Sequence, residues 1–362
     1  MSRSYVFLLA VPLYLACNNN IGDPALPPIA DSLAADSFKW EADHFGDVRV
    51  LRYQIPGWEL LSAQQKELAY YLTQAGLAGR DIMWDQNYRY NLRIRRSLEA
   101  VIKNHQSGNA DAKWDAFMEY AKEVFFSNGI HHHYGMDKFN PGFDRAWYEG
   151  QLKAAGHNLA PDVLDAMFDP AIDNKKVSLD PEKDLLLASA VNFYGEDVSE
   201  KEATDFYAAM EKKDDPQPLS YGINSKLVRT AEGKLAEQVW RVGGMYGAAL
   251  EKCIEWLIKA QGVAENEQQK KVIGLLIEFY RSGDLAKWDE FNVEWVKETA
   301  GTVDFIMGFV EVYNDPIGKR GSYESCVEVN DPEATKNMSV IQKNAQRCED
   351  DSPTMDQLTT KE

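Results

Sequence analysis

The chain has 362 residues, 44% of them hydrophobic and 11% aromatic, so it can bury one large core or two modest ones and does not have the composition of a disordered protein. Its formal net charge of −18 argues against nucleic acid as a partner, because phosphates attract Lys and Arg. A negative field instead favours ligands that carry ammonium groups, such as peptides.

The N-terminus has the features of an export signal. Arg3 precedes an apolar run of twelve residues, Tyr5–Ala16, which is shorter than the roughly 20 residues that span a bilayer. The following Cys17 resembles the lipidated Cys of a bacterial lipoprotein; the alternative is a simple signal peptide. We therefore expect a signal peptide at 1–17 and a tether at 18–36. The protein would then lie in the bacterial cell envelope, as a periplasm-facing or surface lipoprotein held only by its lipid anchor, or alternatively as a soluble periplasmic protein.

The middle of the chain is predicted to be mostly helical. Ser62 with Gln65 and Ser199 with Glu202 form capping boxes that begin two of the helices. Apolar residues at helical spacing continue in two further segments, 250–258 and 272–279.

Strands are predicted at 48–54, 223–230 and 235–242, and a hairpin is predicted at 303–329. Residues 231–233 supply a turn between the second and third of these strands. Helices and antiparallel strands in one unit indicate an α+β domain, placed at 37–348 and followed by a polar tail at 349–362.

The first strand of the hairpin ends in two functional side chains. Apolar residues alternate on one face of this strand, and Glu311 and Tyr313 continue the face: Val303, Phe305, Met307, Phe309. A turn at Asp315-Pro316 and Gly318 then leads to a second alternating run at 322–329. Glu311 could hold a cation, and Tyr313 could donate a hydrogen bond to a developing oxyanion. In the alternative interpretation, the pair is only the solvent-exposed end of a strand.

Cys and His spacing predicts no metal site. Cys253, Cys326 and Cys348 have no close spacing, and Cys253 lies on an apolar helical stripe, which indicates a buried thiol. In an extended run, only His131 and His133 could share an ion, and a tight site would require further ligands.

The segment Glu311–Gly318 resembles the Glu-x-Tyr-x-Asp-Pro-x-Gly motif of the dipeptidyl peptidase III family of zinc metallopeptidases, in its Bacteroides-like form. Further segments resemble the same family in the same order, and together they extend over roughly residues 35–358: 70–75, 79–82, 126–134, 220–227, 240–246, 344–346 and 349–353.

The resemblance implies the lower lobe of that fold, with a small antiparallel β-barrel-like core among helices. It also implies that Tyr313 polarises the scissile carbonyl and that Glu311 receives the N-terminal ammonium of the substrate. Val310 and Val312 would border the same subsite, and Glu324 matches an acidic position with a less definite role. Tyr134 would line the pocket for the second side chain of the substrate, with His133 flanking it.

Family members bind Zn²⁺ through a His-Glu-x-x-Gly-His helix and a later Glu, and none of the six His residues here is followed by Glu. We therefore expect the chain to be an N-terminal portion that holds no zinc and is inactive alone. The full-length family enzyme releases N-terminal dipeptides from short peptides with a free N-terminus. The alternative is a non-catalytic, lipid-anchored, peptide-binding envelope protein.

Overall fold

The computed structural model describes residues 38–105, 111–212 and 214–353. The predicted signal peptide with Cys17, the tether at 18–36 and the last nine residues of the polar tail lie outside these ranges. The chain divides into two units, Met1–Trp40 and Glu41–Glu362. In the first unit, the rings of Phe38 and Trp40 meet edge to face with centroids 4.9 Å apart. All that follows concerns the second unit.

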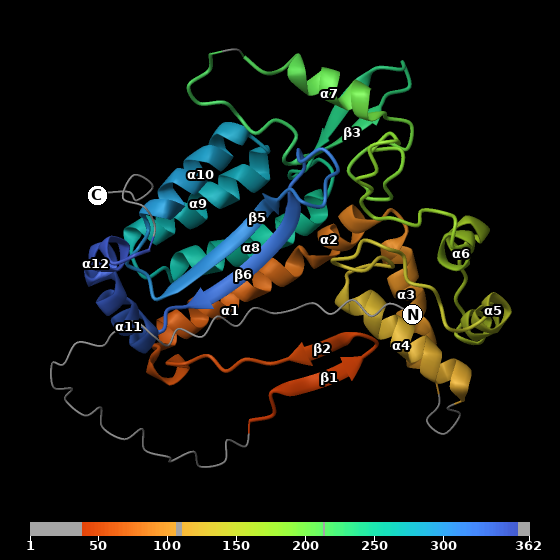
Figure 1. Cartoon of the computed structure of the whole chain (residues 1–362), viewed down its shortest axis with the longest axis horizontal. Helices are drawn as coiled ribbons and strands as arrows, with labels where there is room; N and C mark the ends of the chain where they lie inside the picture. The colour runs from red at the N-terminus through yellow and green to blue at the C-terminus, as the bar shows by residue number, and fades with distance from the viewer. Residues whose placement is uncertain (1–37, 106–110, 213, 354–362) are drawn as a thin grey trace. The chain divides into compact units, whose positions relative to one another are not determined.

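Helices and antiparallel strands make up the second unit, as the sequence predicts (Figure 1). The described helices are η1 (Trp58–Leu60), α1 (Ala63–Ala78), α2 (Arg80–Asn87), α3 (Asn91–Asn104), α4 (Ala112–Phe126), α5 (Arg145–Ala154), α6 (Pro161–Phe168), α7 (Glu200–Ala208), α8 (Gly247–Gly262), α9 (Glu267–Ser282), α10 (Leu285–Lys297), α11 (Pro332–Lys343) and α12 (Ala345–Asp350). The described strands are β1 (Glu41–Phe45), β2 (Val48–Leu51), β3 (Ser225–Arg229), β4 (Leu235–Val239), β5 (Val303–Glu311) and β6 (Ser322–Val329). Within the described residues, no helix is both long and apolar enough to span a membrane.

Both predicted capping boxes are present. The Ser62 hydroxyl accepts the backbone N–H of Gln65 at 3.2 Å, and the Gln65 side chain accepts the N–H of Ser62 at 2.8 Å. Ser199 and Glu202 do the same at the start of α7. Such caps satisfy N–H groups that the first helical turn leaves unpaired. The stripe predicted for α8 is buried except at Ile258, which is 49% exposed, so that residue does not belong to the core.

Each described strand pairs with its neighbour in the sequence, in antiparallel β1–β2, β3–β4 and β5–β6 hairpins. The turn predicted at 231–233 joins β3 to β4, and β2 ends at Leu51 instead of continuing to residue 54. The predicted β-barrel-like core is wrong for the described residues, because these hairpins do not join into a closed sheet. Helices, and not further strands, cover the long β5–β6 hairpin, since α1 contacts both of its strands.

Two hydrophobic clusters form the interior. The larger one lies between the β5–β6 hairpin and helices α1, α8, α9 and α10, and the smaller one between α2, α3, α4, α5 and α6. Figure 1 shows the hairpin running alongside α1. The alternating face predicted for β5 is confirmed, because its four apolar residues are at most 1% exposed: Val303, Phe305, Met307 and Phe309. Burial of this face fixes the register of β5.

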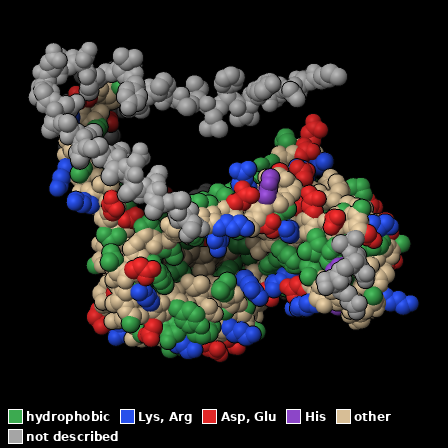
Figure 2. Space-filling view, turned by 90° about the horizontal axis from the view of Figure 1, so that it is seen from below, with side chains coloured by type: hydrophobic (Ala, Val, Ile, Leu, Met, Phe, Trp, Pro, Cys, Tyr) green, Lys and Arg blue, Asp and Glu red, His purple; other side chains and the backbone are tan. Residues whose placement is uncertain are grey.

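The charged side chains of the described residues are mixed in sign on the face that Figure 2 shows. Lys and Arg alternate with Asp and Glu around apolar areas, so the drawn face has no continuous basic surface among its described residues.

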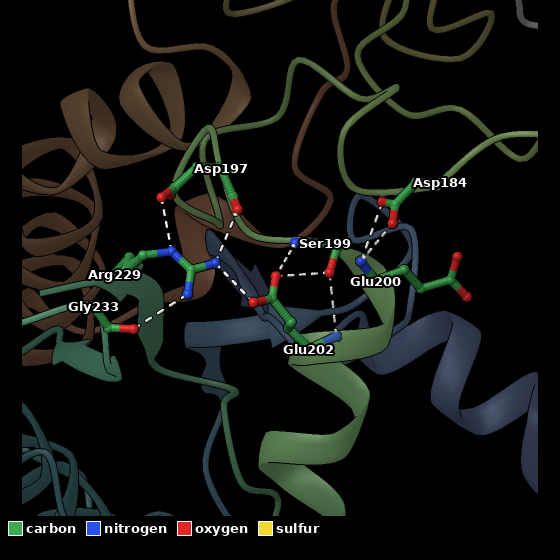
Figure 3. Close-up of polar contacts among 7 residues, drawn as sticks. All are labelled: Asp184, Asp197, Ser199, Glu200, Glu202, Arg229 and Gly233. Atoms are coloured by element: carbon green, nitrogen blue, oxygen red, sulfur yellow. Dashed lines mark hydrogen bonds and ion pairs between the residues drawn. The ribbon is translucent and has the colours of Figure 1, made fainter.

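An ion-pair network attaches the start of α7 to the β3–β4 hairpin (Figure 3). The Arg229 guanidinium on β3 donates to Asp197 at 2.8 Å and to Glu202 on α7 at 2.9 Å. Hydrogen bonds from Ser199, together with Arg229, lower the pKa of Glu202 to about 2. On the other side of the cap, the Asp184 carboxylate accepts the backbone N–H of Glu200 at 2.9 Å. The network therefore fixes α7 relative to the β3–β4 hairpin, and Tyr207 of α7 and Glu237 of β4 belong to the support of the site described next.

Candidate functional site

The residues of the Glu311 motif lie at the turn end of the β5–β6 hairpin. Glu311 is the last residue of β5 and lies opposite Ser322, whereas Glu324 on β6 lies opposite Gly308. The register shifts between Phe309 and Glu311, which places a β-bulge at Val310. A bulge inserts one extra residue and re-aims the side chains after it. Simple alternation predicts that Glu311 continues the buried face of Phe309. Because of the bulge, Glu311 is instead exposed.

Electrostatic effects show which groups surround the Tyr313 phenol. Burial and then the charge of Glu324 raise its pKa, with smaller contributions from Glu311 and Tyr134, while a hydrogen bond with Asn314 lowers it. Such effects fade beyond a screening length of about 8–10 Å. The structure therefore brings four predicted site residues together, and we call Tyr134, Glu311, Tyr313 and Glu324 the hairpin-end cluster.

The two carboxylates of the hairpin-end cluster influence each other. Burial, and then the charge of Glu311, raise the pKa of Glu324. Two neighbouring carboxylates repel, and a bound cation relieves that repulsion. The phenol of Tyr313 is 59% exposed and, with its raised pKa, keeps its proton at neutral pH. The cluster can thus bind an ammonium group and donate a hydrogen bond to a neighbouring oxygen.

The two predicted valines are half-buried, and the structure gives them different surroundings. Val310 lines an apolar cavity of about 150 Å³ together with Trp288, Phe305 and Met307. The carbonyl of Val312 accepts the backbone N–H of Asp315 at 3.0 Å and so begins the turn that follows Tyr313. Their suggested role at the edge of a subsite stays a prediction.

Asp315 organises that turn from inside. Its carboxylate accepts the backbone N–H groups of Ile317, Lys319 and Arg320 at 3.2, 2.8 and 2.8 Å. It also accepts the Tyr194 hydroxyl at 2.8 Å. The Asp315 side chain is buried, and so is Asn314, whose amide donates to Ser322 at 3.0 Å. These bonds fix the backbone on both sides of Tyr313, so the phenol projects from a rigid support.

Arg320 is fully buried behind the same turn. Its guanidinium donates to the Tyr194 hydroxyl at 2.8 Å and to the Tyr207 hydroxyl, and its centre lies 4.2 and 4.6 Å from the two ring centroids. Tyr207 in turn donates to Glu237 on β4 at 2.8 Å. Since Tyr207 belongs to α7, the ion pairs of Figure 3 also hold this support in place.

The loop that carries Tyr134 is shaped by the neighbouring histidines. The Nδ1 atom of His132 accepts the backbone N–H groups of Tyr134 and Gly135 at 3.1 and 2.8 Å, so this atom carries no proton when both bonds form. The Tyr134 side chain is 82% exposed, and its ring centroid lies 4.5 Å from that of His133. The His133 ring therefore lies beside the Tyr134 ring, and the suggested role of both at a substrate pocket stays a prediction.

The His131–His133 run serves packing and loop shape in this structure. His131 is buried, and burial is the first cause that lowers its pKa to about 4. Its Nε2 lies 2.7 Å from the Asp173 carbonyl oxygen. Over the described ranges, no group of three or more His, Cys, Asp or Glu side chains is placed to hold a metal ion. Cys253 is a buried thiol, as predicted, and burial raises its pKa to about 11.

Sequence reasoning missed the support of the cluster. Arg320 follows the Glu311 motif, but its partners Tyr194 and Tyr207 lie more than 100 residues earlier in the chain. A lone Arg in a turn segment usually reaches solvent, and no local pattern indicates that this one is buried. The only signal in the sequence is the presence of several Tyr residues between 194 and 221, and these fit ordinary core packing equally well.

Parts of the chain are similar to known proteins. Residues 195–356 match the model of Peptidase family M49. Two curated relatives are both called dipeptidyl peptidase 3: the protein of Homo sapiens is 33% identical over 86 residues, and that of Nematostella vectensis is 28% identical over 121 residues. These alignments cover 24% and 33% of this chain but only 12% and 15% of the relatives.

Solved structures match a larger part of the chain. Dipeptidyl peptidase III from Caldithrix abyssi superposes with a TM-score of 0.58 at 18% identity, over 85% of this chain and 47% of that one. The enzyme from Corallococcus sp. strain EGB gives 0.53 at 16% identity, over 85% and 46%. The chain thus spans less than half of these structures, and at such identities the likeness concerns the fold. The resemblance of this chain to the dipeptidyl peptidase III family, and to peptidase family M49 over residues 195–356, is therefore confirmed.

Proposed function

We propose that this chain supplies part of the substrate-binding surface of a zinc-dependent dipeptidyl peptidase, which releases N-terminal dipeptides from short peptides. The observation that carries the proposal is the hairpin-end cluster, where the Glu311 and Glu324 carboxylates lie within electrostatic reach of the Tyr313 phenol. Paired carboxylates fit a peptide ammonium, and the adjacent phenol fits the carbonyl that the peptidase would polarise.

Each member of the hairpin-end cluster has a role in this proposal. Glu311 receives the N-terminal ammonium, and Glu324 adds negative charge beside it. Tyr313 donates its proton in a hydrogen bond to the oxygen that becomes negative in the transition state. Tyr134, on its own loop, contacts the second side chain of the substrate. Val310 and Val312 would border the ammonium subsite.

The zinc of such an enzyme would polarise the carbonyl and activate water. The described residues do not fit that ion, because they bring together no group of three possible ligands. We propose that the residues of this chain contact only the substrate and not the metal. They bind its ammonium end and stabilise its oxyanion.

The kinetic test uses a form of the protein that has peptidase activity. Tyr313→Phe removes a hydrogen bond that matters mainly in the transition state, so kcat should fall about 10²–10³-fold with little change in KM. Glu311→Gln removes charge that contacts ground and transition states alike, so KM should rise. Equal and small effects from both substitutions would mean that the pair is only the exposed end of a strand.

A location in the bacterial cell envelope, through lipidation of Cys17, is a separate proposal supported by the sequence alone. Cys17→Ser should move the protein from the membrane fraction to the soluble fraction of cells. A wild-type protein that is already fully soluble in the periplasm would contradict the lipid anchor and favour a simple signal peptide.

A further inference from the structure

A cavity of about 440 Å³ lies between strand β6 and helices α1 and α2. Tyr323, Ser325, Cys326 and Val327 of β6 line it together. Consecutive strand residues point to opposite faces, so a cavity that contacts both faces lies at an edge of the strand. Strand β5 pairs with one edge of β6 along its whole length. The cavity therefore lies along the other edge, and we call it the β6 groove.

Backbone groups of β6 point into the β6 groove. In an antiparallel pair, alternate residues direct both N–H and C=O towards the partner strand, and the residues between them direct both groups outwards. The Asn330 N–H donates to the Thr302 carbonyl at 2.8 Å, so even-numbered residues of β6 face β5. The Tyr323 N–H accordingly faces outwards and donates to a side chain of α2 at 2.8 Å. Ser325 and Val327 follow in the same phase, and their N–H and C=O groups have no hydrogen-bond partner among the residues that the structure describes.

The helical side of the β6 groove carries an apolar surface and a cation. Thr73 and Leu77 line it from α1, where Leu77 is 50% exposed, and Arg80 lines it from the first position of α2. Within the described ranges, the one ion pair of Arg80 is with Asp81 at 3.7 Å, and Asp81 binds Arg95 more closely, at 2.6 Å. The terminal nitrogens of Arg80 are therefore available to an anion.

Two close approaches define the direction of α1 along β6, which Figure 1 shows side by side. A Cβ atom at Gly76 would lie 2.1 Å from Ser325 Oγ, and one at Gly79 would lie 2.1 Å from the Tyr323 ring. Helix α1 therefore runs antiparallel to β6, and Arg80 lies at the Tyr323 end of the groove. The β6 residues that line the groove extend over about 13 Å, which is the length of three to four residues of an extended ligand.

We propose that the β6 groove binds the C-terminal residues of a peptide, with the free α-carboxylate on Arg80. A guanidinium group binds a carboxylate through charge-assisted hydrogen bonds. The outward N–H and C=O groups of Ser325 and Val327 pair with the peptide backbone, as an added strand does at a free sheet edge. Because the carboxylate lies at the start of β6, the peptide runs antiparallel to it. Leu77 and Met83 supply apolar contacts, so the ligand class is a peptide of three or more residues with an apolar C-terminal residue.

This inference goes beyond the proposed function, which concerns the amino end of a substrate. The hairpin-end cluster offers carboxylates to an ammonium group, whereas the β6 groove offers a guanidinium group to a carboxylate. An N-acetylated peptide lacks the ammonium that Glu311 would receive, so it tests the groove alone. Glu311→Gln should therefore bind such a peptide as the wild type does.

The first experiment measures binding of N-acetyl-Ala-Ala-Leu and of its C-terminal amide to the purified chain by calorimetry. Wild type should bind the free acid roughly 10-fold or more tightly than the amide, and Arg80→Gln should lose this preference. Arg96→Gln is the matched control, because Arg96 is exposed on α3 and does not line the groove. Leu77→Glu, which places a negative charge in the groove, should weaken binding of the acid independently of Arg80.

Three results of this experiment would overturn the proposal. They are equal binding or no binding of the two peptides by the wild type, a preference that survives in Arg80→Gln, and a preference that is lost in Glu311→Gln. The last result would place the peptide at the hairpin-end cluster.

The second experiment tests the backbone pairing by NMR, through the exchange of amide protons with solvent in a chain labelled at Ser, Cys and Val. Saturating N-acetyl-Ala-Ala-Leu should slow exchange at Ser325 and Val327, because a bound strand accepts their N–H groups. Cys326 is the internal control, since its N–H faces β5 and should exchange at the same rate with and without peptide. Unchanged exchange at Ser325 and Val327, or equal slowing at Cys326, would overturn the proposed pairing.

Discussion

The hydroxyl of Tyr194 donates a hydrogen bond to the carboxylate of Asp315 at 2.8 Å, although 121 residues separate the two in the chain. Tyr194 thereby connects a distant segment to the turn that follows Tyr313. The position of the phenol consequently depends on packing between distant segments and not on the hairpin alone.

Tyr194→Phe should destabilise the protein. It leaves Asp315 without one partner and removes an acceptor for the buried Arg320 guanidinium, so the free energy of unfolding should fall by about 1–3 kcal/mol. Urea denaturation measures this loss. Tyr53→Phe is the matched control, because Tyr53 is 79% exposed and its hydroxyl should contribute little. Equal stabilities of the two variants would show that the buried hydrogen bond to Asp315 makes no net contribution to the free energy of unfolding.

Gly308→Ala should disturb the hairpin next to the cluster. A Cβ atom at Gly308 would lie 2.6 Å from the Trp288 ring, and the φ angle of +152° disfavours any other residue. We expect a loss of about 2 kcal/mol or more in the free energy of unfolding. Gly262→Ala, at the end of α8, meets nothing within 4 Å and should be neutral or slightly stabilising. A neutral Gly308→Ala would mean that Trp288 moves freely.

Lys176→Met should stabilise the protein, and the gain should depend on pH. The pKa of Lys176 is about 8 in the folded protein, below the ordinary value of 10.5. Burying the charged amine therefore lowers the free energy of unfolding by its full amount below pH 8, and this cost disappears above about pH 10.5. Removing the amine should therefore raise the free energy of unfolding by about 3 kcal/mol at pH 7, with the gain shrinking as the pH rises. Denaturation from pH 6 to 10, with Lys175→Met as control, measures the difference. A loss of stability at pH 7 would contradict burial as the cause of the lowered pKa of Lys176.

His131 should make the fold sensitive to acid. Its pKa falls from 6.5 in the unfolded chain to about 4 in the buried site. A His with a lowered folded pKa contributes no penalty above pH 6.5, and its cost grows as the pH falls towards 4. The stability difference between wild type and His131→Gln should therefore shift in favour of the variant by up to about 3 kcal/mol over that interval. A difference that is independent of pH would exclude His131 as the titrating group.

The sequence allowed local features to be predicted, and contacts between distant segments remained hidden. The capping boxes at Ser62 and Ser199 and the buried face of β5 follow from spacing over a few residues, and all are present. The bulge at Val310 could not be predicted, because alternation alone carries Glu311 onto the buried face. The barrel-like core failed for a related reason: pairing between hairpins is a long-range property that strand patterns do not specify.

For the candidate site, too, local motifs could be recognised in the sequence and contacts between distant segments could not. Resemblance to a known motif pointed to Glu311, Tyr313, Glu324 and Tyr134, and electrostatic effects place the four near one another. It did not point to Arg320, since nothing in the local sequence indicates that this side chain is buried. Burial of a charged side chain depends on which distant elements surround it, and that information appears only in the folded structure.

The claim that Glu311 receives a peptide ammonium is tested most directly by binding to the purified chain. Calorimetry would compare tetra-alanine amide with its N-acetylated form, for wild type, Glu311→Gln and Tyr313→Phe. Wild type and Tyr313→Phe should prefer the free peptide by roughly 10–100-fold, the value of a charge-assisted contact, and Glu311→Gln should lose this preference. Equal binding of the two peptides to the wild type, absence of binding by either, or a preference that survives in Glu311→Gln would contradict the proposed site.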